Sequence, residues 1–368
     1  MVVSLARMSS PPRRHHYISQ FLMRGFSEAP DAKNPPIWRL EKKTGRPNRS
    51  SVDSDAVVRD FYKLKEVPGV EPTKIEKDLA MIEGIAAGHL ERLLTGAELG
   101  KVDRSELATY FMLQHRRTPR GRQWFVEMYE HMSKLIMEVN VNRIDNTDGI
   151  REFLAREGHD ASDEAVEAFR KDVIDSWREG RVVVEATSDH EVLGMFTAGN
   201  EIAVSIASQM TWTLLRSEPP HEFVLGDHPI CMYDPTAIPG HGVGWMSSPA
   251  TEVTLPLGRY ACLAFKIGPP VCGEERASQD RVLDLNLRSY ACAEWAYFGA
   301  TQAAVQNVRA YARRNVERVH KYEPRVPHLF ILEREQDADL LKVVETYKPE
   351  GKPVRGFFRQ PRSAERRR

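Results

Sequence analysis

Cysteines are few in this chain of 368 residues, and charge of neither sign is in excess. The four cysteines show no C-x-x-C spacing: they are Cys231, Cys262, Cys272 and Cys292. This argues against a disulfide framework or a cysteine metal cluster, and it fits a reducing compartment. Lys and Arg number 52 and so do Asp and Glu, so no overall field attracts nucleic acid or an anionic membrane. A general nucleic-acid binder is therefore disfavoured, whereas a local basic site remains open.

Long hydrophobic runs are also missing from the sequence. No stretch approaches the roughly 20 apolar residues that span a bilayer, and the start of the chain is too polar for a signal-peptide core. We therefore expect a cytoplasmic protein without a membrane partner. The chain does have 41% hydrophobic and 28% charged residues, a balance typical of a folded globular protein.

Hydrophobic periodicity separates a helical part of the chain from a later part rich in strands. Helical spacing dominates from about residue 73 to 210, and a closing helix is expected over about 279–299. Between them, alternating patterns predict four strands, at residues 211–215, 222–225, 251–255 and 260–266. The first two flank Pro219-Pro220 and are expected to form a hairpin-like pair.

These patterns predict an α+β fold that is mainly α-helical. A small antiparallel β-sheet is expected from about residues 211–266, together with short N-terminal strands such as 37–40. We expect one domain over residues 14–330. The first 13 residues and the basic tail at 350–368 are predicted to be disordered.

One predicted helix changes character along a single face. Its buried side carries first apolar and then polar side chains, at offsets of 0, 3, 4, 7, 10 and 11: Leu107, Tyr110, Phe111, Gln114, Arg117 and Thr118. Pro119 follows and should end or kink the helix. Because an unpaired buried polar group costs on the order of 1–3 kcal/mol, we expect Gln114, Arg117 and Thr118 to join an internal network or to line a cleft.

Two adjacent histidines stand among aromatic and aliphatic residues at positions 14–26, which we call the double-histidine segment. His15 and His16 could act as general acid, general base or ligand, because histidine titrates near neutrality. Arg24, in the same segment, and Arg117 could hold a phosphate or a carboxylate through paired N–H groups. The alternative is a histidine pair whose hydrogen bonds are satisfied inside a packed core.

Further polar positions occur later in the chain. Asp227 ends a predicted strand in Gly226-Asp227-His228-Pro229 and could orient an imidazole or bind a metal. Gln114 and Asn286 could orient a substrate or donate to a developing oxyanion. Each also has a structural interpretation, since Gly-Asp-His-Pro commonly forms a turn and buried amides commonly satisfy backbone groups.

The sequence thus predicts a common polar site built from distant residues. The predicted catalytic residues are His15, His16 and Asp227, with His228 beside them, and the predicted binding residues are Arg24, Gln114, Arg117 and Asn286. One core rarely needs so many ionisable groups, which favours such a site. No H-x-x-x-H or H-E-x-x-H spacing occurs, so no metal ligands are assigned. A divalent metal remains open, and no other cofactor is predicted.

Several stretches, taken in order, resemble the DUF4238 family over about residues 14–299. The family has two histidines before an aromatic-rich segment, as here, and a helix that ends Gln-x-x-Arg-Thr-Pro, as at 114–119. Its strand ending in Asp-Asn/His-Pro resembles residues 227–229, and its Pro-Leu turn resembles 256–257. Its late asparagine, followed by a helix with aromatic residues, resembles 286–297.

The sequence departs from the family at two positions of the double-histidine segment. Ser19 stands where proline is usual, and Met23 stands where leucine is usual. Both are packing changes and leave the polar set intact. The family has no established activity, so the resemblance implies membership and no particular reaction.

Two functions fit this polar set. The first is a hydrolase, of which a nuclease would be one form, acting on a phosphate or acyl group, with the arginine-rich residues 116–122 attracting an anionic substrate. The second is a non-catalytic ligand-binding or regulatory module that uses the same pocket. The partner in either case would be an anionic small molecule or a nucleic acid. An open pocket with His16 and Asp227 within hydrogen-bond reach would favour the hydrolase.

Overall fold

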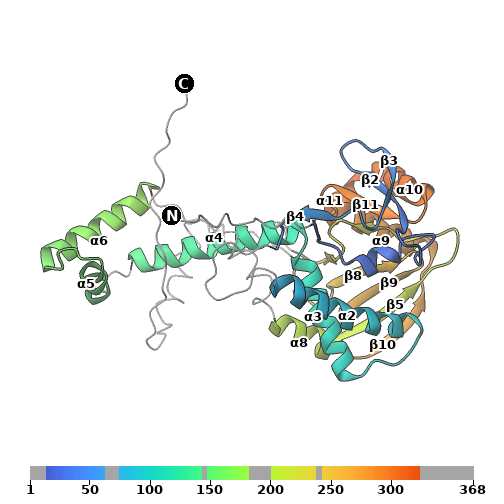
Figure 1. Cartoon of the computed structure of the whole chain (residues 1–368), viewed down its shortest axis with the longest axis horizontal. Coiled ribbons are helices and arrows are strands. Elements are labelled where there is room, and N and C mark those ends of the chain that lie inside the picture. Colours follow the sequence, from blue (N-terminus) through green and yellow to red (C-terminus); the bar gives the residue numbers. More distant parts are fainter. Residues whose placement is uncertain (1–13, 63–73, 143–146, 182–199, 238–242, 324–368) are drawn as a thin grey trace, which may run out of the picture. The chain divides into compact units, whose positions relative to one another are not determined.

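The computed structural model of the chain describes residues 14–62, 74–142, 147–181, 200–237 and 243–323. These residues form two compact units (Figure 1). The first unit takes the described residues up to Phe125 and those from 200 to 323, and the second takes 126–142 and 147–181. The single domain expected over 14–330 remains a prediction. The disorder expected for 1–13 and 350–368 falls outside the described residues.

The larger sheet of the first unit has five strands, in the order β10-β5-β9-β8-β7. Their bounds are β5 (Met210–Arg216), β7 (Cys231–Tyr233), β8 (Glu252–Gly258), β9 (Ala261–Ile267) and β10 (Cys272–Arg276). All neighbours are antiparallel except β10 and β5. The strands predicted at 251–255 and 260–266 are confirmed as β8 and β9, and the two pair with each other. The prediction that residues 211–215 and 222–225 form a hairpin is wrong. Residues 211–215 lie in β5, which pairs with β9 along one edge and with β10 along the other.

A second sheet brings the early strands next to late ones, in the order β3-β2-β11-β6. Its strands are β2 (Pro36–Glu41), β3 (Pro47–Ser51), β6 (Leu225–Gly226) and β11 (Ala296–Gly299). The closing helix expected over 279–299 is therefore too long, since α9 covers only Gln279–Cys292. The helix stops because the backbone N–H groups of Glu294, Trp295 and Ala296 donate to the carboxylate of Asp227 instead of to helical carbonyls.

The remaining elements of the first unit surround these two sheets (Figure 1). The strands β1 (Arg14–His16) and β4 (Val57–Arg59) pair with each other. The other elements are α1 (Gln20–Arg24), α2 (Lys74–Leu94), α3 (Lys101–Arg116), α8 (Asn200–Gln209), α10 (Gln302–Arg314) and α11 (Val316–Tyr322). The predicted α+β fold is confirmed.

The helix α3 carries the stripe that the sequence predicts. Its apolar residues Leu107, Tyr110 and Phe111 are fully buried, and the ring of Phe111 meets those of Trp212 and Phe265 at 5.5 and 5.2 Å between centroids. The helix ends at Arg116, and α4 (Pro119–Asn142) begins with the proline, as predicted.

The second unit contains α5 (Thr147–Arg156) and α6 (Asp163–Arg178), and α4 runs into it from the first unit. Phe153 of α5 packs against Phe169 of α6, with ring centroids 5.6 Å apart. Across the described residues, no helix has the combination of length and apolar character needed to cross a lipid bilayer.

A close backbone contact fixes the double-histidine segment on the larger sheet. The carbonyl of Gly25 accepts a hydrogen bond of 2.7 Å from the N–H of Arg259. A Cβ atom at Gly25 would overlap the carbonyl oxygen of Leu257 and lie 3.0 Å from the Cα of Gly258. Only glycine fits this approach without a backbone shift.

We predict that Gly25→Ala lowers the free energy of unfolding by about 2 kcal/mol, because overpacking against backbone costs roughly 1–3 kcal/mol. Gly84→Ala is the control, since a Cβ there meets no atom within 4 Å and alanine raises helix stability by up to about 1 kcal/mol. Urea unfolding of both variants measures the difference. Equal stability of the two variants would contradict the predicted contact.

Candidate functional site

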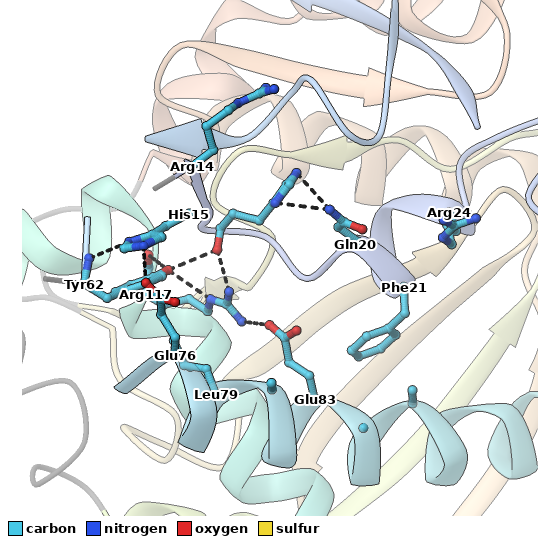
Figure 2. A pocket seen from close by; sticks show the side chains of 14 residues that line it. Arg14, His15, Gln20, Phe21, Arg24, Tyr62, Glu76, Leu79, Glu83 and Arg117 are labelled. Atoms are coloured by element: carbon cyan, nitrogen blue, oxygen red, sulfur yellow. Dashed lines mark hydrogen bonds and ion pairs between the residues drawn. The ribbon is translucent and has the colours of Figure 1, made fainter. Parts of the chain in front are cut away.

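A cavity of about 510 Å³ lies between the double-histidine segment and α2. Its polar walls combine three arginines, two histidines, two glutamates, a glutamine and a tyrosine: Arg14, Arg24, Arg117, His15, His16, Glu76, Glu83, Gln20 and Tyr62 (Figure 2). Its apolar lining comes from Phe21 and from the small or aliphatic residues of α2. Four predicted site residues, His15, His16, Arg24 and Arg117, therefore meet at one cavity.

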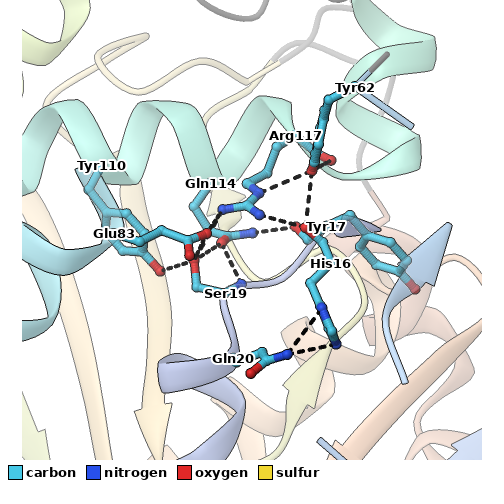
Figure 3. A network of polar contacts seen from close by, with 9 residues as sticks. All are labelled: His16, Tyr17, Ser19, Gln20, Tyr62, Glu83, Tyr110, Gln114 and Arg117. Atoms are coloured by element: carbon cyan, nitrogen blue, oxygen red, sulfur yellow. Dashed lines mark hydrogen bonds and ion pairs between the residues drawn. The ribbon is translucent and has the colours of Figure 1, made fainter. Parts of the chain in front are cut away.

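The guanidinium of Arg117 is the centre of a buried network (Figure 3). It donates to the hydroxyl of Tyr62 at 3.2 Å, to Oγ of Ser19 at 3.2 Å and to the carbonyl of His16 at 2.5 Å. It also forms an ion pair with Glu83. Burial alone would lower the pKa of Arg117, but Tyr62 and Glu83 outweigh it and raise the pKa. Arg117 is therefore a permanent cation that crosslinks the segment to α2 and α3.

Gln114 belongs to the same network and is fully buried. Its Oε1 accepts from the backbone N–H of Ser19 at 3.2 Å, and its Nε2 donates to the carbonyl of Tyr17 at 2.9 Å. The hydroxyl of Tyr110 donates to Oγ of Ser19 at 3.2 Å. Gln114 thus positions the double-histidine segment and does not line the cavity. The sequence left two alternatives for these polar residues, an internal network or the lining of a cleft. Gln114 belongs to the network alone, whereas Arg117 belongs to the network and also lines the cavity.

His15 has a polar neighbour at each ring nitrogen, and the contact at Nε2 is a close approach to a carboxylate without hydrogen-bond geometry. Its Nδ1 accepts the backbone N–H of Tyr62 at 3.0 Å, so its proton is on Nε2, which lies 2.5 Å from Oε1 of Glu76. The ring also stacks on that of Tyr62, with centroids 5.3 Å apart. These contacts fix the tautomer and orientation of His15.

His16 is held more loosely and is only partly buried. Its Nε2 lies 3.2 Å from the carbonyl oxygen of Val52, which can only accept, so the ring proton is on Nε2. The amide nitrogen of Gln20 lies 3.2 Å from both ring nitrogens, and as a donor it can bond only to the unprotonated Nδ1. Burial lowers the pKa of His16, and the charges of Arg14 and Arg117 lower it further. The ring is therefore neutral at pH 7, Nδ1 is its basic nitrogen, and His16 lines the cavity.

Two arginines of the cavity bind only backbone carbonyls among the residues that the structure describes. Arg24 donates through Nη1 to the carbonyls of Pro30 and Ala32, at 2.8 and 3.3 Å. Arg14 donates to the carbonyl of Asp53 at 3.2 Å. Because carbonyls carry no formal charge, neither guanidinium is paired with a carboxylate within the described ranges.

Asp227 and Asn286 lie elsewhere and bind backbone groups. The carboxylate of Asp227 accepts three N–H groups, from residues 294–296, at 2.7 to 2.9 Å. Burial raises the pKa of Asp227, while these bonds and Lys42 oppose the rise. Asn286 accepts from the N–H of Val224 at 2.9 Å and donates to the carbonyl of Glu222 at 2.7 Å. Neither lines the cavity, and the catalytic and binding roles predicted from the sequence remain predictions.

Sequence reasoning missed several residues of the cavity, above all Glu76, Glu83 and Tyr62. The signal for the glutamates was their spacing of seven residues, which places both on one side of α2. Within the described ranges, no group of three or more His, Cys, Asp or Glu side chains is arranged to hold a metal ion.

His228 belongs to a separate interior cluster. Its ring contacts that of His115, with centroids 4.9 Å apart, and its Nδ1 lies 2.6 Å from the hydroxyl of Thr118. Burial lowers the pKa of His115 to about 3, and Arg116 adds to the effect. Burial also lowers the pKa of His228 well below 6.5, and His115 and Arg120 lower it further. Both rings are neutral in the folded protein.

We predict that the protein loses stability as the pH falls below 6.5, the ordinary histidine value. Below this pH, His115 and His228 are protonated in the unfolded chain but stay unprotonated in the folded protein. Each histidine therefore lowers the free energy of unfolding by up to about 1.4 kcal/mol per pH unit. Their contribution is complete above pH 6.5 and declines toward the lowered pKa values. Urea unfolding at pH 7.5 and at 5.5 measures the slope. Unchanged stability between these pH values would contradict the prediction.

Comparison with known proteins places this fold and cavity in a family. No curated protein and no solved structure matches the chain significantly. The model of a family described as a protein of unknown function, DUF4238, matches residues 14–322. The match includes the whole cavity, the network around Arg117 and both sheets. The chain therefore belongs to the DUF4238 family.

Proposed function

We propose that the cavity beside the double-histidine segment binds the anionic group of a small ligand. The observation that carries this proposal is the pair Arg14 and Arg24, which have no carboxylate partner among the described residues. A guanidinium offers five N–H donors in a planar fork, and the carbonyl bonds of Arg24 use only Nη1. Donors remain for a carboxylate or phosphate oxygen.

The charges of the cavity favour a ligand with one negative charge. Three arginines line it with two glutamates, and the neutral ring of His16 adds no charge. Arg117 is matched by Glu83, and Glu76 lies against His15. A carboxylate or a phosphodiester, each a monoanion, matches the single excess positive charge.

The apolar part of the cavity favours a ligand with an uncharged group beside the anion. Phe21, Leu79, Ala80 and Ala87 contribute apolar surface. Gly84 also lines the cavity, and a side chain added there would meet open space. Gly88, one turn further along α2, is equally open but does not line the cavity.

This pair of glycines gives a matched test of ligand binding. We expect wild type to bind benzoate or bis(p-nitrophenyl) phosphate in isothermal titration calorimetry. Gly84→Leu should abolish binding because its side chain fills the cavity, whereas Gly88→Leu should bind as wild type does. Both replace glycine in a helix, so neither should lower the melting temperature.

Arg24→Gln should weaken the same binding roughly tenfold, as expected when one charge-assisted hydrogen bond is lost. Equal binding by the two leucine variants would refute the assignment to this cavity. So would the absence of binding of either probe to the wild-type protein.

Hydrolysis of the bound ligand is a second candidate, and the state of His16 favours it. The ring is neutral, the carbonyl of Val52 orients it, and Nδ1 is its basic nitrogen. After a bound water displaces the amide of Gln20, Nδ1 can accept the water proton. The water oxygen then bonds to phosphorus or to the acyl carbon, the bond to the leaving oxygen breaks, and the ring returns the proton to that oxygen. Asp227 has no part in this scheme.

We predict that His16→Ala lowers hydrolysis of bis(p-nitrophenyl) phosphate at least 100-fold, the usual contribution of a general base. Its melting temperature should stay near that of wild type, because the carbonyl that Arg117 and Tyr62 bind is kept in the variant. His15→Ala is the contrast, since it removes a ring fixed by Tyr62 and Glu76 and should lower the melting temperature. Full hydrolysis by His16→Ala would refute the role of His16 as general base, and no hydrolysis by the wild-type protein would leave it as a binder.

A further inference from the structure

A second cavity, of about 600 Å³, lies between the larger sheet and α9. The sheet contributes one face, because the cross-strand pairs Thr213 with Ala264 and Glu252 with Lys266 all line the cavity. The start of α9 contributes its N-cap, Ser278, and the first turn after it. This cavity shares no residue with the one beside the double-histidine segment.

A buried carboxylate organises the charges of this second cavity. Glu252 lies 2.5 Å from Arg281, 2.6 Å from Arg288 and 3.4 Å from Lys266. Burial raises the pKa of Glu252, but Arg288 and Arg281 outweigh it and lower the pKa overall. Glu252 is therefore ionised. Its single negative charge lies close to three positively charged side chains and cannot balance all three.

The cations that line the cavity outnumber its carboxylates by two. Four cationic side chains line the cavity with two carboxylates, Glu252 and Glu275. Outside the lining, Asp284 pairs with Arg281, Arg288 and Arg318, and the exposed Glu218 pairs with Arg276. The positive end of the α9 dipole adds to this field.

Arg288 lines the cavity and retains one donor without a partner among the described residues. Its side chain is 7% exposed, and two of its nitrogens bind Glu252 and Asp284. Its Nε is buried without a hydrogen-bond partner among the described residues. Buried guanidinium donors are normally satisfied, since leaving one unpaired costs on the order of 1–3 kcal/mol or more.

One part of the lining, the neutral wall, is uncharged and partly apolar, and it continues the sheet face that carries Glu252 and Lys266. Leu215 and Ala264 lie on the sheet side, and Tyr233 and Pro235 complete the wall. The ring of Tyr233 packs under the guanidinium of Arg288, at 4.7 Å to the ring centroid. A ligand that fits both walls has a doubly charged end and an uncharged organic end.

We propose that this second cavity binds a phosphomonoester, with the phosphate dianion at Lys266, Arg276, Arg281 and Arg288 and the organic group against the neutral wall. At pH 7.5 a phosphomonoester carries close to two negative charges, which match the excess of the cavity. Arginine side chains and a helix N-terminus are the donors that phosphate oxygens commonly receive in proteins. The proposal is independent of the function proposed for the first cavity.

Calorimetric titration of the full chain with phenyl phosphate at pH 7.5 tests this assignment. Lys266→Gln and Arg276→Gln should each weaken binding roughly tenfold. Both side chains are mostly exposed, 60% and 75%, so these variants should fold normally. The bond from Arg276 to the exposed Glu218 is a surface ion pair, which contributes little in solvent. Arg156→Gln is the matched control and should bind as wild type does, because Arg156 is also exposed in a surface ion pair and does not line the cavity.

Variants of the first cavity and two further anions complete the test. Arg24→Gln and Gly84→Leu should leave the affinity for phenyl phosphate unchanged, and a loss in these variants would assign the binding to the first cavity and overturn the proposal. Unchanged binding by Lys266→Gln would also overturn it. Succinate tests the phosphate requirement, and equal affinity for it would refute the ligand class. Inorganic phosphate should bind more weakly than phenyl phosphate, and equal affinity would refute the role given to the neutral wall.

Discussion

The buried guanidinium of Arg117 is the interaction on which the arrangement of the first cavity depends. A charge inside a protein is tolerated only when it is paired and hydrogen-bonded, and removal of one partner of a buried pair costs roughly 3–5 kcal/mol. Its partners come from the double-histidine segment, from Tyr62 and from Glu83 on α2. Because all of them must reach one planar group, the two walls of the cavity are held at a fixed separation.

The backbone and the side chain of one residue serve different purposes in this network. The carbonyl of His16 accepts from Arg117 and Tyr62, while its ring is only loosely bound at the cavity. Asp227 and Asn286 show the opposite arrangement, since their side chains bind backbone groups and organise the ends of β6, α9 and β11. Polar residues that look alike in a sequence pattern therefore divide into those that build the fold and those that face the cavity.

Sequence patterns predicted many of the helices and strands but not which strands pair with each other. The stripe on α3 and the break before Pro119 depend on spacing and on a missing N–H, so the sequence contains them. The strand β11 was missed because Tyr297 and Phe298 suit a buried helix or strand equally, and the deciding contact comes from Asp227, far away in sequence. The number of polar groups that need partners predicts that Arg117 lies near the histidines, whereas nothing in the sequence distinguishes Glu83 from a glutamate exposed to solvent.

The smaller sheet has a consequence for how the protein is made. Its strands β2 and β3 are translated early, but β2 needs β11 along its other edge, and that strand ends at Gly299. At about 5–20 residues per second, the ribosome takes tens of seconds to deliver the missing strand. During that interval the nascent chain carries a strand edge open to pairing with other chains. The order of synthesis therefore leaves this edge of β2 unpaired until Gly299 has been added to the chain.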